Sequence, residues 1–268
     1  MAFIPSGLFI MGRDEDNPAE NNPAGNPAHH VLVDAFFMDK TEVTNSEYAE
    51  FVRETGYVPP DDWPNDKPPI GQEQWPVTYV SLADADAFAV WRSKRDNVTY
   101  RLPTEEEWEY AARNGAQNNL YPWGDKWITN RAVTAEVGSN FPKPVGSYPE
   151  GRNRWGVLDL IGNVSEWTSS KVYLKASFYS VALDKTLPNS DESVMKDWIV
   201  IRGGSAESQS SGEKAITATR RELIPLFAKD RRIGFRLVRD KEENRDINQP
   251  VLNETAPLSN NSFNPTPR

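Results

Sequence analysis

Residues 116–200 limit the choice of fold most strongly, because this long middle segment has no helical periodicity. Its short apolar stretches alternate with Gly, Pro, Asn and Trp. The chain of 268 residues contains 16 Gly and 21 Pro, so loops are abundant elsewhere as well. Irregular backbone in a globular chain needs partners for its polar groups, which are water, side chains or bound ions. The sequence therefore predicts an α+β fold with little regular secondary structure.

Three helices are predicted before this segment, because the same N-terminal capping pattern occurs three times. A hydroxyl residue is followed three positions later by a carboxylate at Thr44-x-x-Glu47, Ser81-x-x-Asp84 and Thr104-x-x-Glu107. Such a pair satisfies backbone N–H groups that have no partner within the first helical turn. Apolar residues then recur on one face of each segment, and Gly56 and Gly115 are predicted to end the first and third helices.

Strands are predicted near both ends of the chain, in four apolar stretches: residues 3–12 (around a turn), 31–38, 198–202 and 233–238. Residues 13–28 are polar and rich in Asn and Pro, which indicates a surface loop. Residues 246–268 contain few large apolar side chains and many Asn and Pro. We therefore expect one domain over residues 1–240 and an extended C-terminal tail over residues 241–268.

Charge and composition exclude several classes of function. The chain has 30 Lys and Arg against 39 Asp and Glu, a net charge of −9, which argues against binding to nucleic acid or to an anionic membrane surface. No apolar run approaches the ~20 residues of a membrane span. The first residues lack the pattern of a signal peptide, which leaves the compartment open. The chain contains no cysteine, so disulfides, thiolate metal sites and cysteine nucleophiles are excluded.

Nine motifs follow one another in an order that resembles the formylglycine-generating enzyme (sulfatase-modifying factor) family. They are FIPSGLFIMG, FFMDKTEVTNSEYAEFV, PVTYVSLADADAFAVW, YRLPTEEEWEYAAR, YPWGD, PVGSYP, GVLDLIGNVSEWTSS, VIRGGS and GFRLV. The resemblance covers residues 3–239. Within the family, the sequence is most similar to bacterial members, which are either kinase-associated or accessory. It implies a variant of the C-type lectin fold, which is often stabilised by calcium.

The same resemblance argues against the family's oxidase chemistry. Those oxidases hold copper with two cysteine thiolates that follow a Gly-Gly-Ser motif, and the matching positions after Ser205 are Ser208 and Glu213. Neither residue replaces a thiolate as a ligand of Cu(I). A tryptophan of the family is replaced by Ser165. We therefore expect no copper and no formylglycine-generating activity.

The only two histidines, His29 and His30, are adjacent. Neighbouring side chains on a strand point to opposite faces, so the two rings are not expected to bind one ion.

A calcium site is predicted where two carboxylates flank a Gly-Asn turn. The resemblance assigns the side chains of Asp159 and Glu166 and the carbonyls of Gly162 and Val164 as ligands, and oxygens of this kind suit calcium. The alternative is a loop without metal, in which Glu166 forms a salt bridge or caps backbone amides. A second site of the family would use Asn130 and the carbonyl of Arg131, although its Asp has no counterpart near residues 139–141.

The first functional hypothesis is a non-catalytic binding or accessory module that binds a protein or peptide. Its groove would comprise Ser165, Ser205, Ser208, Glu213, Arg220 and Arg221. Arg220 and Arg221 belong to a local basic stretch. In the alternative interpretation, this stretch pairs with nearby carboxylates and does not bind a partner. The second hypothesis is an oxidoreductase in which Ser208 and Glu213 form an oxygen-based metal site. The third is a structural subunit whose tail lies along a neighbour in a larger complex.

Overall fold

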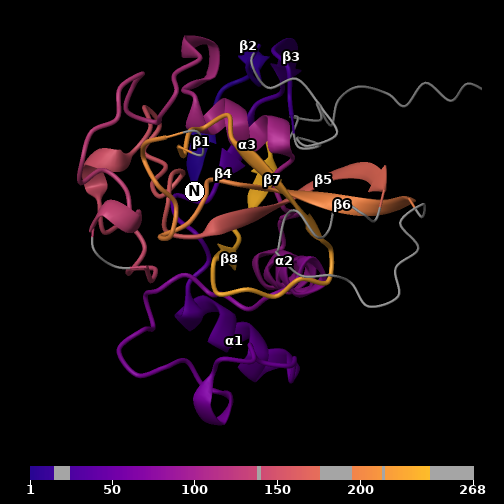
Figure 1. Cartoon of the computed structure of the whole chain (residues 1–268). Coiled ribbons are helices and arrows are strands. Elements are labelled where there is room, and N and C mark those ends of the chain that lie inside the picture. The colour runs from indigo at the N-terminus through magenta and orange to yellow at the C-terminus, as the bar shows by residue number, and fades with distance from the viewer. Residues whose placement is uncertain (15–24, 138–139, 176–194, 213–214, 242–268) are drawn as a thin grey trace, which may run out of the picture.

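The computed structural model describes residues 1–14, 25–137, 140–175, 195–212 and 215–241 (Figure 1). Its α-helices are α1 (Asn45–Thr55), α2 (Leu82–Asp96) and α3 (Glu105–Ala112). Its short 3-10 helices are η1 (Pro64–Asp66), η2 (Gly115–Gln117), η3 (Ala135–Val137) and η4 (Pro149–Gly151). In the described part of residues 118–164, η3 and η4 are the regular elements, so the expected irregular backbone is present there.

The strands form three small sheets. The first is antiparallel and joins the two ends of the domain, with the order β1 (Ala2–Ile4), β4 (Phe36–Met38) and β9 (Val238–Asp240). The second is the antiparallel pair β2 (Gly7–Met11) and β3 (His29–Val33). The third has the order β7 (Arg221–Pro225), β6 (Met195–Arg202), β5 (Ser165–Lys175) and β8 (Ile233–Gly234). Only β8 runs parallel to its neighbour in this third sheet.

All three helix starts contain the capping boxes that the sequence predicts. In α1 the N–H of Glu47 donates to Thr44 Oγ1 (3.2 Å), and the N–H of Thr44 donates back to Glu47 Oε2 (2.8 Å). The same reciprocal bonds begin α2 and α3. Gly56 ends α1 with a left-handed φ of 69°. Gly115 lies three residues beyond the end of α3 and instead begins η2.

Two of the predicted strands are each divided between two sheets. Residues 31–38 contribute to β3 and β4, and residues 233–238 contribute to β8 and to the start of β9. Residues on both sides of these breaks are buried, including Val33, Phe36, Phe235 and Leu237. Each of these continuous apolar runs therefore belongs to a segment that passes from one sheet to another. The hydropathy of the run does not reveal the residue at which the chain changes sheets.

The strand β5 was missed, because residues 165–175 were predicted to be irregular. Glu166, Trp167 and Thr168 are all fully buried, so this strand lacks the alternation of buried and exposed residues by which strands are recognised. A register shift between Trp167 and Lys171 disturbs the pattern further.

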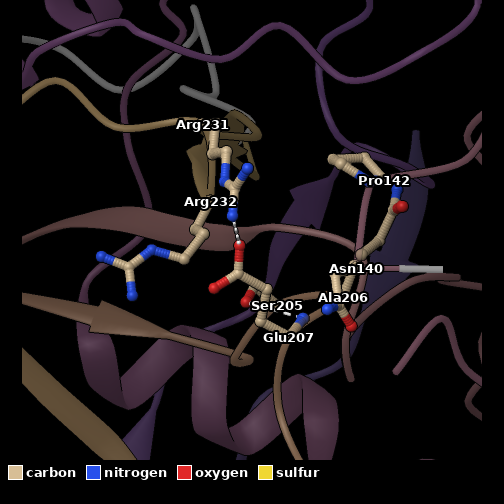
Figure 2. Close-up of a pocket in the computed structure, with 8 residues that line it drawn as sticks. Asn140, Pro142, Ser205, Ala206, Glu207, Arg231 and Arg232 are labelled. Atoms are coloured by element: carbon tan, nitrogen blue, oxygen red, sulfur yellow. Dashed lines mark hydrogen bonds and ion pairs between the residues drawn. The ribbon is translucent and has the colours of Figure 1, made fainter. Parts of the chain in front are cut away.

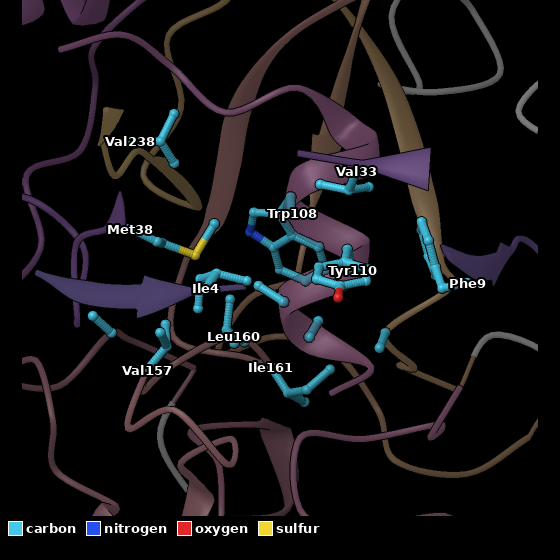
Figure 3. Packing of buried hydrophobic residues seen from close by; sticks show 14 of the residues in the cluster. Ile4, Phe9, Val33, Met38, Trp108, Tyr110, Val157, Leu160, Ile161 and Val238 are labelled. Carbon is cyan, nitrogen blue, oxygen red and sulfur yellow. The ribbon is translucent and has the colours of Figure 1, made fainter. Parts of the chain in front are cut away.

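Two large apolar cores and one small cluster on β6 and β7 support the described part of the domain. One surrounds α3 and brings together Ile4, Phe9, Met38, Trp108 and Leu160 (Figure 3). The other contains Tyr48, Phe51, Phe88, Trp167 and Phe235, from α1, α2, β5 and the segment that follows β8. The helix α3 links the two regions, because the indole N–H of Trp108 donates to the carboxylate of Glu166 at the start of β5 (3.0 Å).

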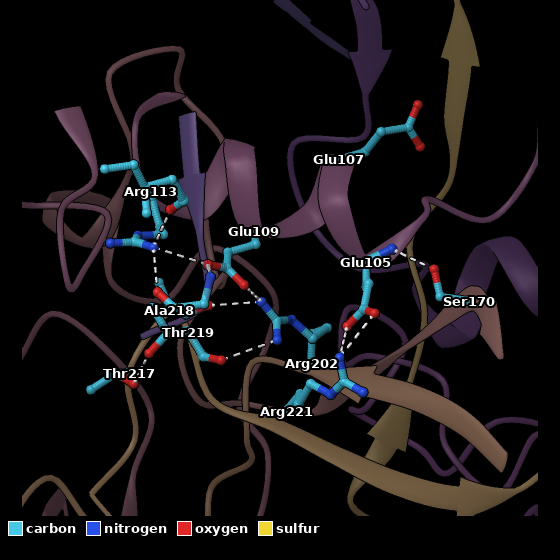
Figure 4. A network of polar contacts seen from close by, with 12 residues as sticks. Glu105, Glu107, Glu109, Arg113, Ser170, Arg202, Thr217, Ala218, Thr219 and Arg221 are labelled. Atoms are coloured by element: carbon cyan, nitrogen blue, oxygen red, sulfur yellow. Dashed lines mark hydrogen bonds and ion pairs between the residues drawn. The ribbon is translucent and has the colours of Figure 1, made fainter. Parts of the chain in front are cut away.

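A buried network of charges fixes α3 against the strands (Figure 4). The carboxylate of Glu109 is fully buried and pairs with the guanidinium groups of Arg202, on β6, and Arg113 (3.0 Å). It also accepts the N–H of Gly12 (2.7 Å). Removing one partner of such a buried pair leaves the other charge unpaired, which costs far more than losing a surface salt bridge.

We expect Glu109→Ala to reduce the free energy of unfolding by about 3–5 kcal/mol, because Arg202 would remain buried without a carboxylate. Glu106→Ala on the same helix serves as the matched control and should cost less than about 1 kcal/mol. Urea denaturation followed by tryptophan fluorescence measures both values. Equal losses in the two variants would contradict the role given to this network.

Candidate functional site

The loop that precedes β5 is built from residues with left-handed backbone. Asp159, Gly162 and Asn163 have φ values of 56°, 79° and 57°. A Cβ on Gly162 would lie 2.1 Å from the carbonyl oxygen of Val133, so only glycine fits there. This tight turn places Asp159 and Glu166, two of the predicted calcium ligands, in one buried region beside Asn163.

Glu166 forms a buried salt bridge. Both of its oxygens are bound by Arg236, with Nε at 2.6 Å from Oε2 and Nη2 at 2.7 Å from Oε1. With the indole N–H of Trp108, the carboxylate accepts three hydrogen bonds. Burial lowers the pKa of Arg236, but the charge and hydrogen bonds of Glu166, together with the charges of Glu42 and Asp159, outweigh burial and raise this pKa above its ordinary value. The salt bridge that was the alternative to a calcium ligand is thus present in the structure.

Glu42 is the residue of this site that the sequence analysis missed. Its side chain is fully buried, and Oε1 accepts a hydrogen bond from Asn163 Nδ2 (3.0 Å). The other oxygen, Oε2, receives no hydrogen bond from an N–H or O–H donor among the described residues, although a proton on Glu42 would join it to the carboxylate of Asp159. Burial raises the pKa of Glu42 well above its ordinary value, and the neighbouring charge of Asp159 raises it further. The two hydrogen-bonded residues are 121 positions apart in the chain, so no local pattern connects them.

The charges of this cluster do not balance within the described residues. Glu42, Asp159 and Glu166 supply three carboxylates, whereas Arg236 supplies one guanidinium. Asp159 Oδ2 accepts the N–H of Gly146 (2.6 Å), and burial raises the pKa of Asp159. The region therefore needs either protons on its carboxyl groups or a cation.

The donors of the cluster are all oxygens, which suits calcium. Among the described residues, no three side chains of the types His, Cys, Asp and Glu are arranged to hold a metal ion. Backbone carbonyls such as those of Gly162 and Val164 would have to complete a site. The free coordinating capacity lies mainly with Glu42 and Asp159, because Glu166 is occupied by Arg236 and Trp108.

The residues predicted for a second calcium site are not part of this carboxylate cluster. Asn130 is exposed and has a left-handed φ of 62°. Arg131 donates from Nη1 to the carbonyl of Glu150 (2.9 Å), and its own carbonyl lies against Gly151, where a Cβ would come within 2.0 Å. Residues 138–139, at the start of the stretch searched for an Asp, lie outside the described residues.

A small hollow opens beside the Gly-Gly-Ser segment (Figure 2). Its open space is about 150 Å³, and its lining consists of Asn140, Pro142, Asn163, Ser205, Ala206, Glu207, Arg231 and Arg232. Arg231 Nη2 contacts Glu207 Oε1 (2.6 Å), and its guanidinium lies over the ring of Phe141, 5.3 Å from the centroid. The hollow is thus bordered by an ion pair and by an exposed aromatic ring.

Of the residues predicted for a groove, the structure brings Ser205 and Ser208 together here. Ser205 lines the hollow, and its N–H donates to Ser208 Oγ (3.0 Å). Ser165 is buried, and its N–H donates to the carbonyl of Arg232 (2.7 Å). Glu213 lies outside the described residues.

The predicted arginines Arg220 and Arg221 do not line the hollow. Arg221 pairs with Glu105 of α3 (3.1 Å), and Arg220 pairs with Glu222 (3.5 Å). The other members of the basic stretch also have carboxylate partners: Lys229 with Asp84, Arg231 with Glu207, Arg232 with Asp230, and Arg236 with Glu166. The stretch therefore matches the alternative interpretation, in which it pairs with local carboxylates.

Within the described residues, the helices are too short or too polar to span a membrane. His29 and His30 are both exposed on β3, and Nδ1 of His29 lies 2.9 Å from the carbonyl of Pro27.

Comparisons with known proteins identify the family of this chain. The chain matches the family described as "Sulfatase-modifying factor enzyme 1-like domain" over residues 1–241. It is 32% identical to the mouse (Mus musculus) "Inactive C-alpha-formylglycine-generating enzyme 2", over 88% of this chain and 84% of that protein. It is also 32% identical to the formylglycine-generating enzyme of Bos taurus, over 63% of this chain and only 57% of the length of that relative.

Solved structures show the same architecture. PvdO from Pseudomonas aeruginosa aligns with a TM-score of 0.66 and 27% identity, covering 89% of this chain and 93% of that one. CarF aligns with a TM-score of 0.64 and 23% identity, covering 90% of this chain and 98% of that one, and supports the fold alone. The chain belongs to the sulfatase-modifying factor family and has its formylglycine-generating-enzyme-like variant of the C-type lectin fold.

Proposed function

We propose that this chain is a non-catalytic binding or accessory module that binds a protein or peptide. The observation that carries the proposal is the absence of any cysteine from a chain of this family. The first thiolate position is Ser208, whose hydroxyl accepts the N–H of Ser205 within its own loop. At the same 32% identity, the mouse relative that is named inactive matches 88% of this chain and the bovine formylglycine-generating enzyme matches 63%, which supports the same conclusion.

The shallowness of the hollow favours surface contact with a peptide over an enclosed cofactor. Pockets for small molecules and cofactors have volumes of about 300–1,000 Å³. The open space of about 150 Å³ includes surrounding solvent and encloses no room for even a water molecule, so a partner would lie across the hollow rather than insert into it. Polar groups of Asn140, Glu207 and Arg231 at its border would bind the backbone or the neighbouring residues of that partner.

The oxidoreductase hypothesis is supported by similarity to relatives named as enzymes, which include the bovine formylglycine-generating enzyme and, at 29% identity over 76% of this chain and 53% of that protein, the hercynine oxygenase of Mycolicibacterium smegmatis. The hydroxyl of Ser208 is, however, already engaged with Ser205. Metal analysis after dialysis separates the two hypotheses. A stoichiometric redox-active transition metal would support the enzyme, and its absence would support the binding module.

The role proposed for the tail in a larger complex concerns residues 241–268, of which 242–268 lie outside the described residues.

Peptide binding can be tested by selecting a random peptide library on the wild-type protein. Asn140 is exposed at the border of the hollow, so Asn140→Trp would cover the hollow without disturbing the core. We expect the selected peptides to bind this variant and Arg231→Ala at least about tenfold more weakly, a loss of about 1.4 kcal/mol.

Lys94→Trp, at an exposed position of α2, is the matched control and should bind the peptides like the wild type. If no peptide is enriched, or if the peptides bind all four proteins equally, the hollow is not the binding site.

Calcium is the second part of the proposal, and the unbalanced carboxylates support it. Glu42 and Asp159, with carbonyls of the 159–166 loop, would hold the ion, which would neutralise their charge and stabilise the irregular backbone. A ligand that binds only the folded state stabilises it by about 2.7 kcal/mol at a hundredfold excess over its Kd.

Calcium should therefore raise the thermal midpoint of the wild-type protein and produce heat in titration calorimetry. Both effects should be absent from the Glu42→Gln and Asp159→Asn variants, which remove the charge at nearly constant shape. Asp61→Asn, at an exposed carboxylate, should respond like the wild type. A wild-type midpoint that is unchanged by calcium would exclude the ion from this site.

A pH-dependent latch holds the loop that forms one wall of the hollow. Ser210 donates its N–H and its hydroxyl to Glu136 Oε1 of η3 (2.5 and 2.7 Å). Burial raises the pKa of Glu136, but these hydrogen bonds outweigh it and lower the pKa to about 2. Because the folded pKa lies below the ordinary value, the stabilisation is present above pH 4.5 and is lost as the pH falls towards 2.

Amide hydrogen exchange of residues 205–212 should thus show protection at pH 5 that decreases by pH 3, after correction for intrinsic exchange rates. Glu136→Gln should exchange equally at both pH values in this segment. If the wild type and the variant have the same pH profile, the latch does not hold the loop.

A further inference from the structure

The β2–β3 ribbon has one apolar face that points away from the core. Its inner face is formed by Phe9, Met11 and Val33, which are buried. On the outer face, Leu8 is 53% exposed and lies in register opposite Leu32, which is 71% exposed. Ile10, beside them, is 38% exposed. The ribbon lies at one end of the molecule, away from the four-stranded sheet (Figure 1). Large apolar side chains grouped in this way are typical of an interaction surface.

The two edges of the ribbon differ. Along β2, the N–H of Ile10 donates to Asn118 Oδ1 (2.9 Å), and the carbonyl of Ile10 accepts from Arg113 Nη1 (2.6 Å). Side chains thus occupy that edge. Along β3, the described part of the chain contributes no strand to the outer edge. Edge strands are usually protected by Lys, Pro or bulges, and the sequence HHVLV of β3 contains no Lys or Pro. The outer edge of β3 is therefore the place where a further strand fits.

The chemistry of this edge favours a second copy of the same chain. An antiparallel pair with a twofold axis at Leu32 places Leu32 opposite its own copy and keeps the apolar faces of both ribbons on one side. In that register, His30 lies opposite Asp34 of the second copy, twice per pair. Asp34 is exposed and follows β3 directly. A histidine opposite a carboxylate is a complementary cross-strand pair.

The charge of the ribbon also permits self-association. The strands GLFIM and HHVLV contain no Asp, Glu, Lys or Arg. The chain as a whole carries a net charge of −9, so most other faces of two copies would repel each other. An uncharged, apolar ribbon with an open edge is a surface on which two such molecules can meet.

We propose that β3 of one molecule pairs with β3 of a second copy, about an axis at Leu32, and forms a continuous four-stranded sheet. Leu8 and Leu32 of both copies form one apolar row across this sheet. The interface is small, because each copy contributes a five-residue strand and few neighbouring side chains. Interfaces below about 1,200 Å² are weak or transient, so the dimer should form in the micromolar range. The proposal does not depend on the hollow or on calcium.

A single engineered cysteine tests the register, because the chain has no cysteine of its own. Leu32→Cys places two thiols opposite each other at the axis, and mild oxidation should convert most of the protein into a disulfide-linked dimer. Leu8→Cys is the matched control on the same face. Three strand spacings of about 4.8 Å, roughly 14 Å in total, would separate its two copies. That distance exceeds the ~7 Å limit between the Cα atoms of a disulfide, so this variant should remain uncrosslinked.

Sedimentation velocity over about 1–200 µM tests the unmodified surface. The wild-type sedimentation coefficient should rise with concentration, whereas Leu32→Lys should remain monomeric. Ile70→Lys, at a fully exposed apolar residue of another loop, should behave like the wild type. A wild type that is monomeric throughout, or equal crosslinking of the Leu32→Cys and Leu8→Cys variants, would overturn the proposal. A wild-type protein that stays monomeric would mean that another segment or another protein covers the outer edge of β3.

Discussion

The buried pair of Glu166 and Arg236 is the interaction on which this fold depends. Both side chains are completely excluded from solvent. Removing two charges from water costs several kcal/mol for each ion, so the pair persists only because its hydrogen bonds are satisfied. Arg236 also donates to the carbonyls of Asp39 (3.2 Å) and Leu158 (2.9 Å). One guanidinium thus connects the start of β5, the end of β4 and the irregular segment, three parts of the chain that no single sheet joins.

The same pair creates the electrostatic problem of the site. Arg236 compensates Glu166 directly, which leaves Glu42 and Asp159 buried with raised pKa values and one oxygen of Glu42 without an N–H or O–H donor among the described residues. Protons on these carboxyl groups would satisfy this pair, and so would a divalent cation. The electrostatic argument for calcium therefore moves from the Asp159 and Glu166 pair indicated by the sequence to Glu42 and Asp159.

Local chemistry explains how much of this could be predicted from the sequence. The capping boxes at Thr44, Ser81 and Thr104 were predicted correctly, because both partners of each bond lie within one helical turn. The family was identified because its motifs follow in order. The position of Glu42 was not predictable in this way, since Asn163 reaches it across 121 residues. The strand β5 was missed because three consecutive buried residues remove the alternation by which strands are recognised.

These observations separate the residues that maintain the scaffold from those that determine its function. Glu166, Arg236 and Trp108 hold the domain together whether or not it has an activity, so their presence does not argue for catalysis. The loop that begins at Ser205 is different, because in this chain it supplies a hydroxyl where the oxidases supply a thiolate. Within this loop, the N–H of Ser205 donates to Ser208 Oγ, and this hydrogen bond stabilises the loop. The loop forms one wall of the hollow. The proposed binding function therefore depends on this loop, whereas the scaffold residues would be needed with or without that function.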